Sequence, residues 1–172
     1  LRHDVDTQID IAVKIANIEY RHEIKSTYFI RLHSHNYNPL CTKDLIKIKN
    51  ILSLGHEIGL HYESDFYKMF NKNLSIKECI DFEIDILQNV TNSKIATICP
   101  HEPTRTKQFH IDDLEYIQAY DPRILQKFKY ISDSSCRWRD GSFYENIKEE
   151  NLSLYILTHP YWWYNLSPIE NY

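Results

Sequence analysis

Short runs of β-branched and aromatic residues alternate with longer amphipathic stretches along most of the chain. The runs predict strands at residues 1–6, 25–30, 57–61, 95–99, 128–132 and 152–157. The spacing of apolar residues predicts helices at residues 9–20, 42–54, 75–87 and, briefly, 114–120. Strands that alternate with helices form βαβ units, so we expect an α/β fold around a mostly parallel sheet.

The length of the chain limits which parallel fold can form. With 172 residues, we expect a single domain, residues 1–172, whose ends need not be natural. A complete eight-fold barrel normally takes about 250 residues, so a smaller or incomplete barrel is favoured.

Composition narrows the class of partner and the compartment. A net charge of -4 gives no reason to expect nucleic acid as a partner, and no apolar run is long enough to span a membrane. The 4 cysteines contain no CxxC pair, which is typical of reduced thiols. We therefore expect a bacterial cytoplasmic protein. A periplasmic or exported location stays open, because the chain begins directly on a strand.

Titratable and aromatic residues collect where the predicted strands end. In parallel α/β folds these ends share one edge, and chemistry gathers there. The residues in question are Asp4, Asp6, His61, Glu63, Asp65, His101, Asp133, His159 and Trp162. Aspartates and histidines together are typical ligands of a divalent cation that activates water. A nearby carboxylate could act as base, and His159 could protonate the leaving group.

Two other histidines are interpreted as structural. His56 lies five residues before His61, about 16 Å away along an extended strand, and so belongs at the opposite edge of the sheet. His3 is expected to be a packing histidine rather than a functional one.

Three segments resemble the polysaccharide deacetylase family, carbohydrate esterase family 4. The segments are Arg2-His3-Asp4-Val5-Asp6, Gly55-His56-Glu57-Ile58-Gly59-Leu60-His61 and Leu157-Thr158-His159-Pro160. Residues 132–141 are similar to a divergent branch associated with surface-polysaccharide (O-antigen) gene clusters. The resemblance implies a distorted, incomplete (β/α)7 barrel. It also implies metal-dependent removal of an acetyl group from an N-acetylated sugar in surface-glycan metabolism.

The resemblance also implies roles for individual residues. Asp4 corresponds to the catalytic base and His159 to the general acid. Asp6 and His61 correspond to ligands of a divalent metal, with zinc expected and cobalt or nickel as alternatives. The position of the family's second metal-binding histidine is held by Asp65, and Glu63 or His101 is the alternative third ligand. Residues expected to contact the carbohydrate are His101, Arg137, Trp138 and Trp162.

A second hypothesis belongs to another class of protein. The departure at Asp65 and the short length also fit a barrel that binds a glycan or a partner without catalysis. Metal content separates the two hypotheses, because the binding barrel needs no stoichiometric cation.

Overall fold

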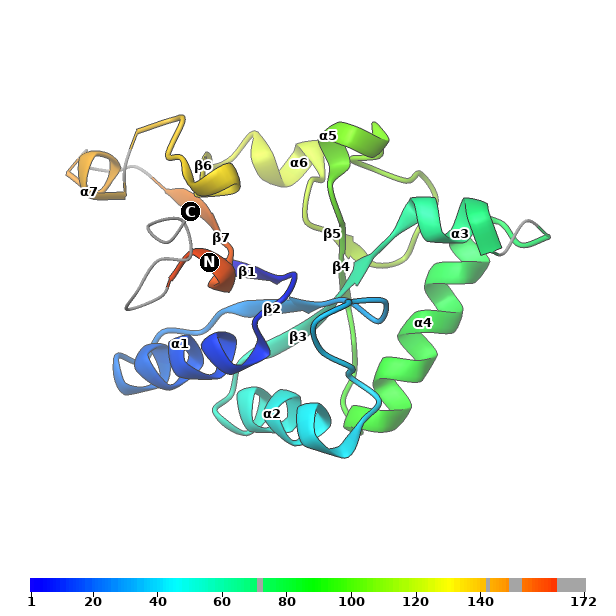
Figure 1. Ribbon diagram of the computed structural model, residues 1–172. Helices are drawn as coiled ribbons and strands as arrows, with labels where there is room; N and C mark the ends of the chain where they lie inside the picture. Colours follow the sequence, from blue (N-terminus) through cyan, green and yellow to red (C-terminus); the bar gives the residue numbers. More distant parts are fainter. Residues whose placement is uncertain (71–72, 142, 149–152, 164–172) are drawn as a thin grey trace, which may run out of the picture.

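The structure is a computed structural model, which describes residues 1–70, 73–141, 143–148 and 153–163. Seven strands form one parallel sheet in the order β5-β4-β3-β2-β1-β7-β6. The strands are β1 (Arg2–Val5), β2 (Thr27–Ile30), β3 (Glu57–Tyr62), β4 (Thr97–Pro100), β5 (Ile117–Gln118), β6 (Lys129–Ser132) and β7 (Leu154–Thr158). The sheet curls into part of a barrel, which confirms the expected incomplete barrel (Figure 1).

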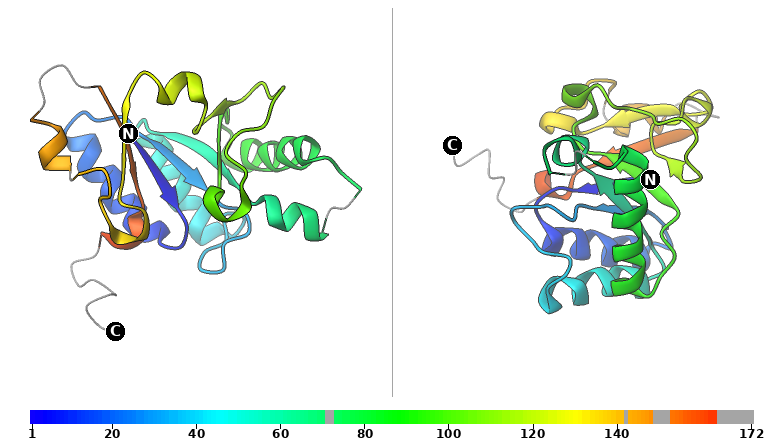
Figure 2. Two further views of the ribbon diagram at one scale, coloured as in Figure 1. Left: turned by 90° about the horizontal axis from the view of Figure 1, so that it is seen from above. Right: turned by 90° about the vertical axis from the view of Figure 1, so that its right-hand side faces the viewer.

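Helices cover the outer, convex face of the sheet (Figures 1 and 2). The longer helices are α1 (Ile9–Arg21), α2 (Thr42–Ser53), α3 (Ser64–Phe70) and α4 (Ile76–Thr91). Shorter helical segments are α5 (Pro103–Thr106), α6 (Pro122–Leu125), α7 (Phe143–Asn146), η1 (Ser134–Cys136) and η2 (Pro160–Trp162). None of the helices described combines the length and the apolar character needed to cross a bilayer.

The main apolar core lies between the sheet and helices α1, α2 and α4. It is built from one face of strands β1 to β4 and one stripe of each of these helices. This is the arrangement that the periodic spacing of apolar residues in the sequence predicts. Its fully buried members include Val5, Ile30, Leu60 and Ile98 from the strands and Ala12, Ile48, Ile51, Ile80 and Leu87 from the helices. This packing fixes the position of each strand end.

The opposite face of each strand lines the barrel interior. In β1, Val5 packs into the helical core, so Arg2 and Asp4 lie on the inner face. A smaller apolar cluster of Phe29, Cys99 and Ala119 shares that interior. The inside of the barrel therefore mixes charged and apolar side chains.

Two local sequence signals have clear structural consequences. Ser75 and Glu78 form the capping box that begins α4, with each side chain bonded to the other residue's backbone nitrogen. In β3, a Cβ atom on Gly59 would lie 2.5 Å from the Phe29 ring and 2.6 Å from Thr97 Oγ1. Only glycine fits between these neighbours, so this position keeps β2, β3 and β4 closely packed.

The prediction of a helix at residues 114–120 is wrong, because Ile117–Gln118 forms strand β5 beside β4. Ile117 N donates to Ala96 O at 3.0 Å, and Ala119 N donates to Ile98 O at 2.9 Å. The exposed edge of β4 supplies these partners, and the local sequence cannot reveal them. Strand β5 is one edge of the sheet and β6 is the other. Tyr155 OH on β7 donates to Ala119 O at 3.0 Å and so links the two sides of the incomplete barrel.

Candidate active site

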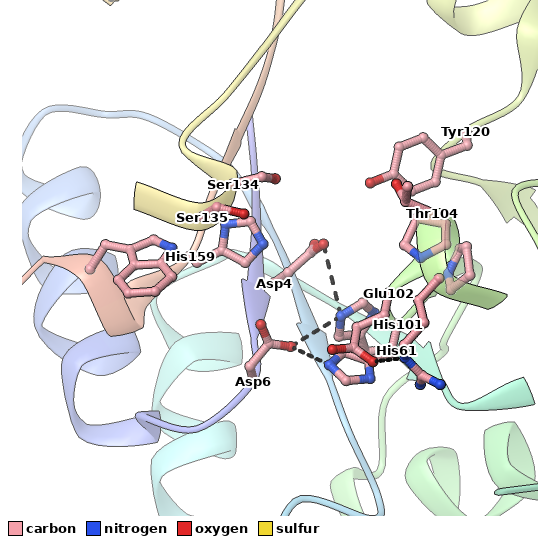
Figure 3. Close-up of a pocket in the computed structure, with 14 residues that line it drawn as sticks. Asp4, Asp6, His61, His101, Glu102, Thr104, Tyr120, Ser134, Ser135 and His159 are labelled. Atoms are coloured by element: carbon pink, nitrogen blue, oxygen red, sulfur yellow. Dashed lines mark hydrogen bonds and ion pairs between the residues drawn. The ribbon is translucent and has the colours of Figure 1, made fainter. Parts of the chain in front are cut away.

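The carboxyl ends of the parallel strands surround a cavity of about 600 Å³ (Figure 3). Asp4 is on β1 and Asp6 follows it, while His61 is near the end of β3. His101 comes directly after β4, and His159 directly after β7. Figure 3 shows Asp4 and Asp6 between His159 on one side and His61 with His101 on the other. The predicted convergence at this edge is therefore present in the structure.

Asp6, His61 and His101 form the most compact cluster of possible metal ligands. Asp6 Oδ1 lies 3.3 Å from His61 Nε2 and 3.5 Å from His101 Nε2. Ligand atoms bound at 2.0–2.2 Å in a tetrahedral zinc site lie about 3.3–3.6 Å from one another. Asp6 Oδ1 is buried, and no hydrogen bond of good geometry reaches it among the described residues. The spacing, the donor chemistry and the lack of a hydrogen bond to this oxygen all fit a divalent cation.

Both histidines of this cluster face Asp6 with the same ring nitrogen. His61 Nδ1 lies 3.0 Å from the backbone oxygen of Cys99, which accepts a hydrogen bond from that nitrogen, so that Nε2 is the nitrogen directed toward Asp6. The His61 and His101 rings are nearly perpendicular at 87°, with centroids 5.2 Å apart. Two lone pairs can therefore approach one point from different directions.

The charges of the cluster are strongly coupled. Burial raises the pKa of Asp6, but the adjacent His61 imidazole outweighs burial and lowers this pKa to about 2. Burial would lower the pKa of His61, yet the carboxylate of Asp4 and other neighbours raise it well above its ordinary value. Burial, followed by the positive charge of His61, lowers the pKa of His101 to about 4. The negative field that favours a proton on His61 equally favours a bound cation.

A second group, Asp4 with His61 and Cys99, is less suited to a cation. All three side chains are buried, and Arg2 Nη1 donates to Cys99 Sγ at 2.9 Å. The Arg2 guanidinium also lies 3.9 Å from Asp4 Oδ1 and 4.4 Å from the centre of the Tyr120 ring. A fixed positive charge at this position would repel a metal ion. The geometry therefore favours Asp6 as the ligand and leaves Asp4 as an unligated carboxylate.

His159 is held by Asp133, a carboxylate that the sequence places at a strand end without assigning it a role. Asp133, just after β6, lies 2.6 Å from His159 Nδ1 and also accepts from the His159 backbone nitrogen at 3.0 Å. Trp163 Nε1 donates to the same carboxylate at 2.9 Å. Burial lowers the pKa of His159, but the bond to Asp133 and the charge of Asp4 raise it overall. A charged His159 at the cavity wall is suited to donate a proton.

Some residues predicted from the sequence lie elsewhere. Asp65 is half-exposed and paired with Arg105 at 2.5 Å, outside the ligand groups found among the described residues. His101 stands in the place predicted for the third ligand. Arg137 is exposed and Trp138 half-buried, and the cavity lining contains neither of them. Trp162, by contrast, lines the cavity.

Several cavity residues were absent from the sequence prediction. Tyr120, Ser134 and Ser135 line the cavity. Ser134 and Ser135 had a usable signal, since they follow the predicted strand at residues 128–132 and Asp133. Tyr120 had none, because it was placed in the predicted helix at residues 114–120.

The fold is similar to that of several solved structures. BA3943, described as a CE4 family pseudoenzyme from Bacillus anthracis, superposes with a TM-score of 0.56 at 15% identity over 92% of this chain and 53% of its own. Peptidoglycan deacetylase PdaC from Bacillus subtilis gives a TM-score of 0.55 at 18% identity over 92% of this chain and 72% of its own. PdaA, a family 4 carbohydrate esterase from Bacillus subtilis, gives a TM-score of 0.53 at 17% identity over 92% of this chain and 65% of its own.

Sequence comparisons add nothing to this similarity. No protein-family model matches the chain, and no curated protein matches it. The chain spans about half the length of BA3943, 53%. Together the sheet order and the superpositions show that the chain has the fold of the family 4 carbohydrate esterases. This confirms the fold that the sequence resemblance implied.

Proposed function

We propose that this protein is a divergent family 4 carbohydrate esterase that uses a divalent cation to remove an acetyl group from an N-acetylated sugar. The observation that carries the proposal is the cluster of Asp6, His61 and His101, whose three ligand atoms converge at the cavity. Support also comes from the fold, which deacetylases such as PdaC share. A role in surface-glycan metabolism follows from the sequence resemblance.

Asp6, His61 and His101 would hold the cation, with zinc favoured by the mixed nitrogen and oxygen donors. When bound, such an ion polarises a carbonyl oxygen and lowers the pKa of water. Asp65 is not part of this set, because its carboxylate is paired with Arg105.

Two other side chains would move protons on opposite sides of the scissile amide. Asp4 is buried at the cavity floor and has an oxygen, Oδ1, without a hydrogen bond partner among the described residues, so it can accept a proton from attacking water. His159 faces the cavity from the other side and can donate its proton to the departing nitrogen (Figure 3). Asp133 fixes the ring of His159 and stabilises its charged form. Products would be acetate and a free amino sugar.

The test compares two substitutions on one strand end, Asp6→Asn and Asp4→Asn. Elemental analysis of the wild type should find about one cation per chain. Asp6→Asn should lose the cation, whereas Asp4→Asn should keep it and lose acetate release from N-acetylglucosamine oligomers or N-acetylated sugar nucleotides. Circular dichroism establishes that each variant is folded.

Other results would overturn the proposal. A wild-type protein without any cation after incubation with zinc, cobalt and nickel would refute metal-dependent hydrolysis. A metal-loaded protein that releases no acetate from either class of substrate would favour the non-catalytic binding barrel. That second function has one supporting observation, namely that BA3943, with the same fold, is described as a pseudoenzyme.

A further inference from the structure

Glu63 and Arg31 form a buried ion pair directly behind the metal cluster. Arg31 follows β2 and Glu63 follows β3, so two neighbouring strand ends bring them together. Arg31 Nε donates to Glu63 Oε1 at 3.0 Å, and Arg31 Nη2 donates to Glu63 Oε2 at 2.8 Å. The side chains are only 9% and 18% exposed. This two-point contact leaves the Glu63 carboxylate little freedom to rotate.

The carboxylate of Glu63 faces the far side of His101. Glu63 Oε2 lies 3.9 Å from His101 Nδ1, while His101 Nε2 lies 3.5 Å from Asp6 Oδ1. The imidazole thus has one carboxylate opposite each nitrogen. At 3.9 Å the contact with Glu63 is too long for a hydrogen bond, but the negative charge still favours the tautomer with its proton on Nδ1. That tautomer leaves Nε2 unprotonated toward Asp6.

The two histidines of the cluster differ in the partner that faces Nδ1. Nδ1 of His61 faces the backbone oxygen of Cys99, a partner that substitution cannot remove. Nδ1 of His101 faces a side chain instead, and that side chain is itself held by Arg31. The backbone of His101 is also fixed, because its nitrogen donates to Tyr62 O at 2.9 Å. The contact of Glu63 is therefore with the ring of His101, whereas a different residue holds the backbone of the loop.

We propose that Glu63, held by Arg31, is a positioning residue that orients His101 toward the cation and thereby sets the metal affinity of the site. This inference rests on the proposed function, and it assigns Glu63 a place behind the ligands instead of among them. Both oxygens of Glu63 are engaged by Arg31, which explains why Glu63 is not itself the third ligand. Carboxylates behind metal-binding histidines commonly raise metal affinity by 10- to 100-fold.

The experiment measures zinc affinity of the full chain by calorimetry, without reference to activity. Glu63→Gln keeps the size of the side chain and removes its charge, and we expect zinc to bind about 10-fold more weakly. The absorption bands of the cobalt-loaded variant should also shift, because the field at His101 changes. Arg31→Lys loses the two-point contact but keeps the positive charge, and it should lower the affinity for zinc by a few-fold.

The matched control is Glu57→Gln, at the other end of β3. Glu57 accepts a hydrogen bond from Thr27 Oγ1 at 2.7 Å and takes no part in the cavity lining. Its substitution should leave zinc affinity and the cobalt spectrum unchanged. Thermal unfolding of each metal-free variant shows that it is folded before titration.

Three outcomes separate the inference from the proposed function. Weaker binding in Glu63→Gln but not in Glu57→Gln supports the inference. Equal binding in the wild type, Glu63→Gln and Arg31→Lys overturns it and leaves the proposed function standing. A wild-type protein that binds neither zinc nor cobalt overturns both.

Discussion

The two faces of strand β1 carry similar polar residues in very different surroundings. On the outer face, His3 Nε2 lies 2.7 Å from Glu19 Oε1 and His3 Nδ1 lies 2.6 Å from Thr158 Oγ1. Tyr28 stacks on the His3 ring, and its hydroxyl donates to Glu19 Oε2 at 2.6 Å. On the inner face, Asp4 and Asp6 each keep a buried oxygen that no hydrogen bond of good geometry reaches among the described residues.

We interpret the residues on the outer face as structural and those on the inner face as the proposed site. Buried polar groups are costly unless they are hydrogen-bonded, so a satisfied network such as that of His3 and Glu19 is explained by stability. The oxygens of Asp4 and Asp6 that lack a hydrogen bond among the described residues are not explained in this way. Groups of this kind indicate that a cation, water or substrate completes the site. The following predictions test this division, from the largest expected effect to the smallest.

His61 and His56 provide the sharpest test, because they flank the same strand. His61→Ala should lose the cation and lower acetate release by about 10³-fold, since a bound cation supplies several kcal/mol of transition-state stabilisation. His56 Nε2 lies 3.0 Å from Ala16 O, and this contact is buried between β3 and α1. His56→Ala should keep the cation and lose about 2 kcal/mol of stability. Elemental analysis measures the cation content, and urea unfolding measures the stability. A His56→Ala protein that remains folded but binds no cation would contradict the distinction between a structural outer face and a metal site on the inner face.

Substitution of His159 tests whether this residue donates a proton in the cavity. His159→Gln should lower kcat by about 10²-fold, the usual scale for loss of a general acid. Cation affinity should not change, because His159 is not among the ligand groups of the described residues. Asp133→Asn should also lower kcat, but by less than His159→Gln. Steady-state kinetics and calorimetry on the same preparations measure both quantities, and a loss of cation in His159→Gln would contradict the assignment.

Glu19 tests the outer face. Glu19→Ala should destabilise the fold by about 3 kcal/mol, because it leaves His3 and Tyr28 without their buried partner. Burial raises the pKa of Glu19, but the bonds from His3 and Tyr28 lower it below 4.5 overall. A lowered pKa in the folded state stabilises the fold above pH 4.5, and this contribution is lost as the pH falls through the folded value.

The difference in stability between the wild type and Glu19→Ala should therefore shrink below pH 4.5. Urea unfolding from pH 7 to pH 3 measures it. Zinc affinity at pH 7 should be the same in both proteins. A large change in affinity would show that the outer network also supports the metal site.

The smallest effect is expected at the aromatic wall of the cavity. Trp162→Ala should raise KM for an N-acetylated oligosaccharide by about 5-fold, consistent with the loss of about 1 kcal/mol of ring contact. Trp138→Ala is the control, because Trp138 is absent from the cavity lining. Its KM should be unchanged. A larger increase in KM for Trp138→Ala than for Trp162→Ala would support the sequence-based prediction that Trp138 contacts the carbohydrate.

Much of the fold could be predicted from the sequence, because its signals are local. Strand composition, helical periodicity and the capping box of Ser75 and Glu78 require only neighbouring residues. The alternation in β1 likewise separates Asp4 from His3 before any tertiary contact is known. Strand β5 was missed because two residues carry too little pattern, and the free edge of β4 selects the conformation.

The sequence also determined which residue types reach the edge of the sheet that carries the candidate site, since the ends of parallel strands share this edge. Asp6, His61 and His159 follow from that rule and from the family resemblance. The tertiary structure selected His101 among the alternative third ligands beside Asp6, paired Asp65 with Arg105 and brought Asp133 to His159. Each of these pairs joins segments that are distant in the chain. Their distances depend on the curvature of the sheet and on loop paths, which local sequence patterns do not encode.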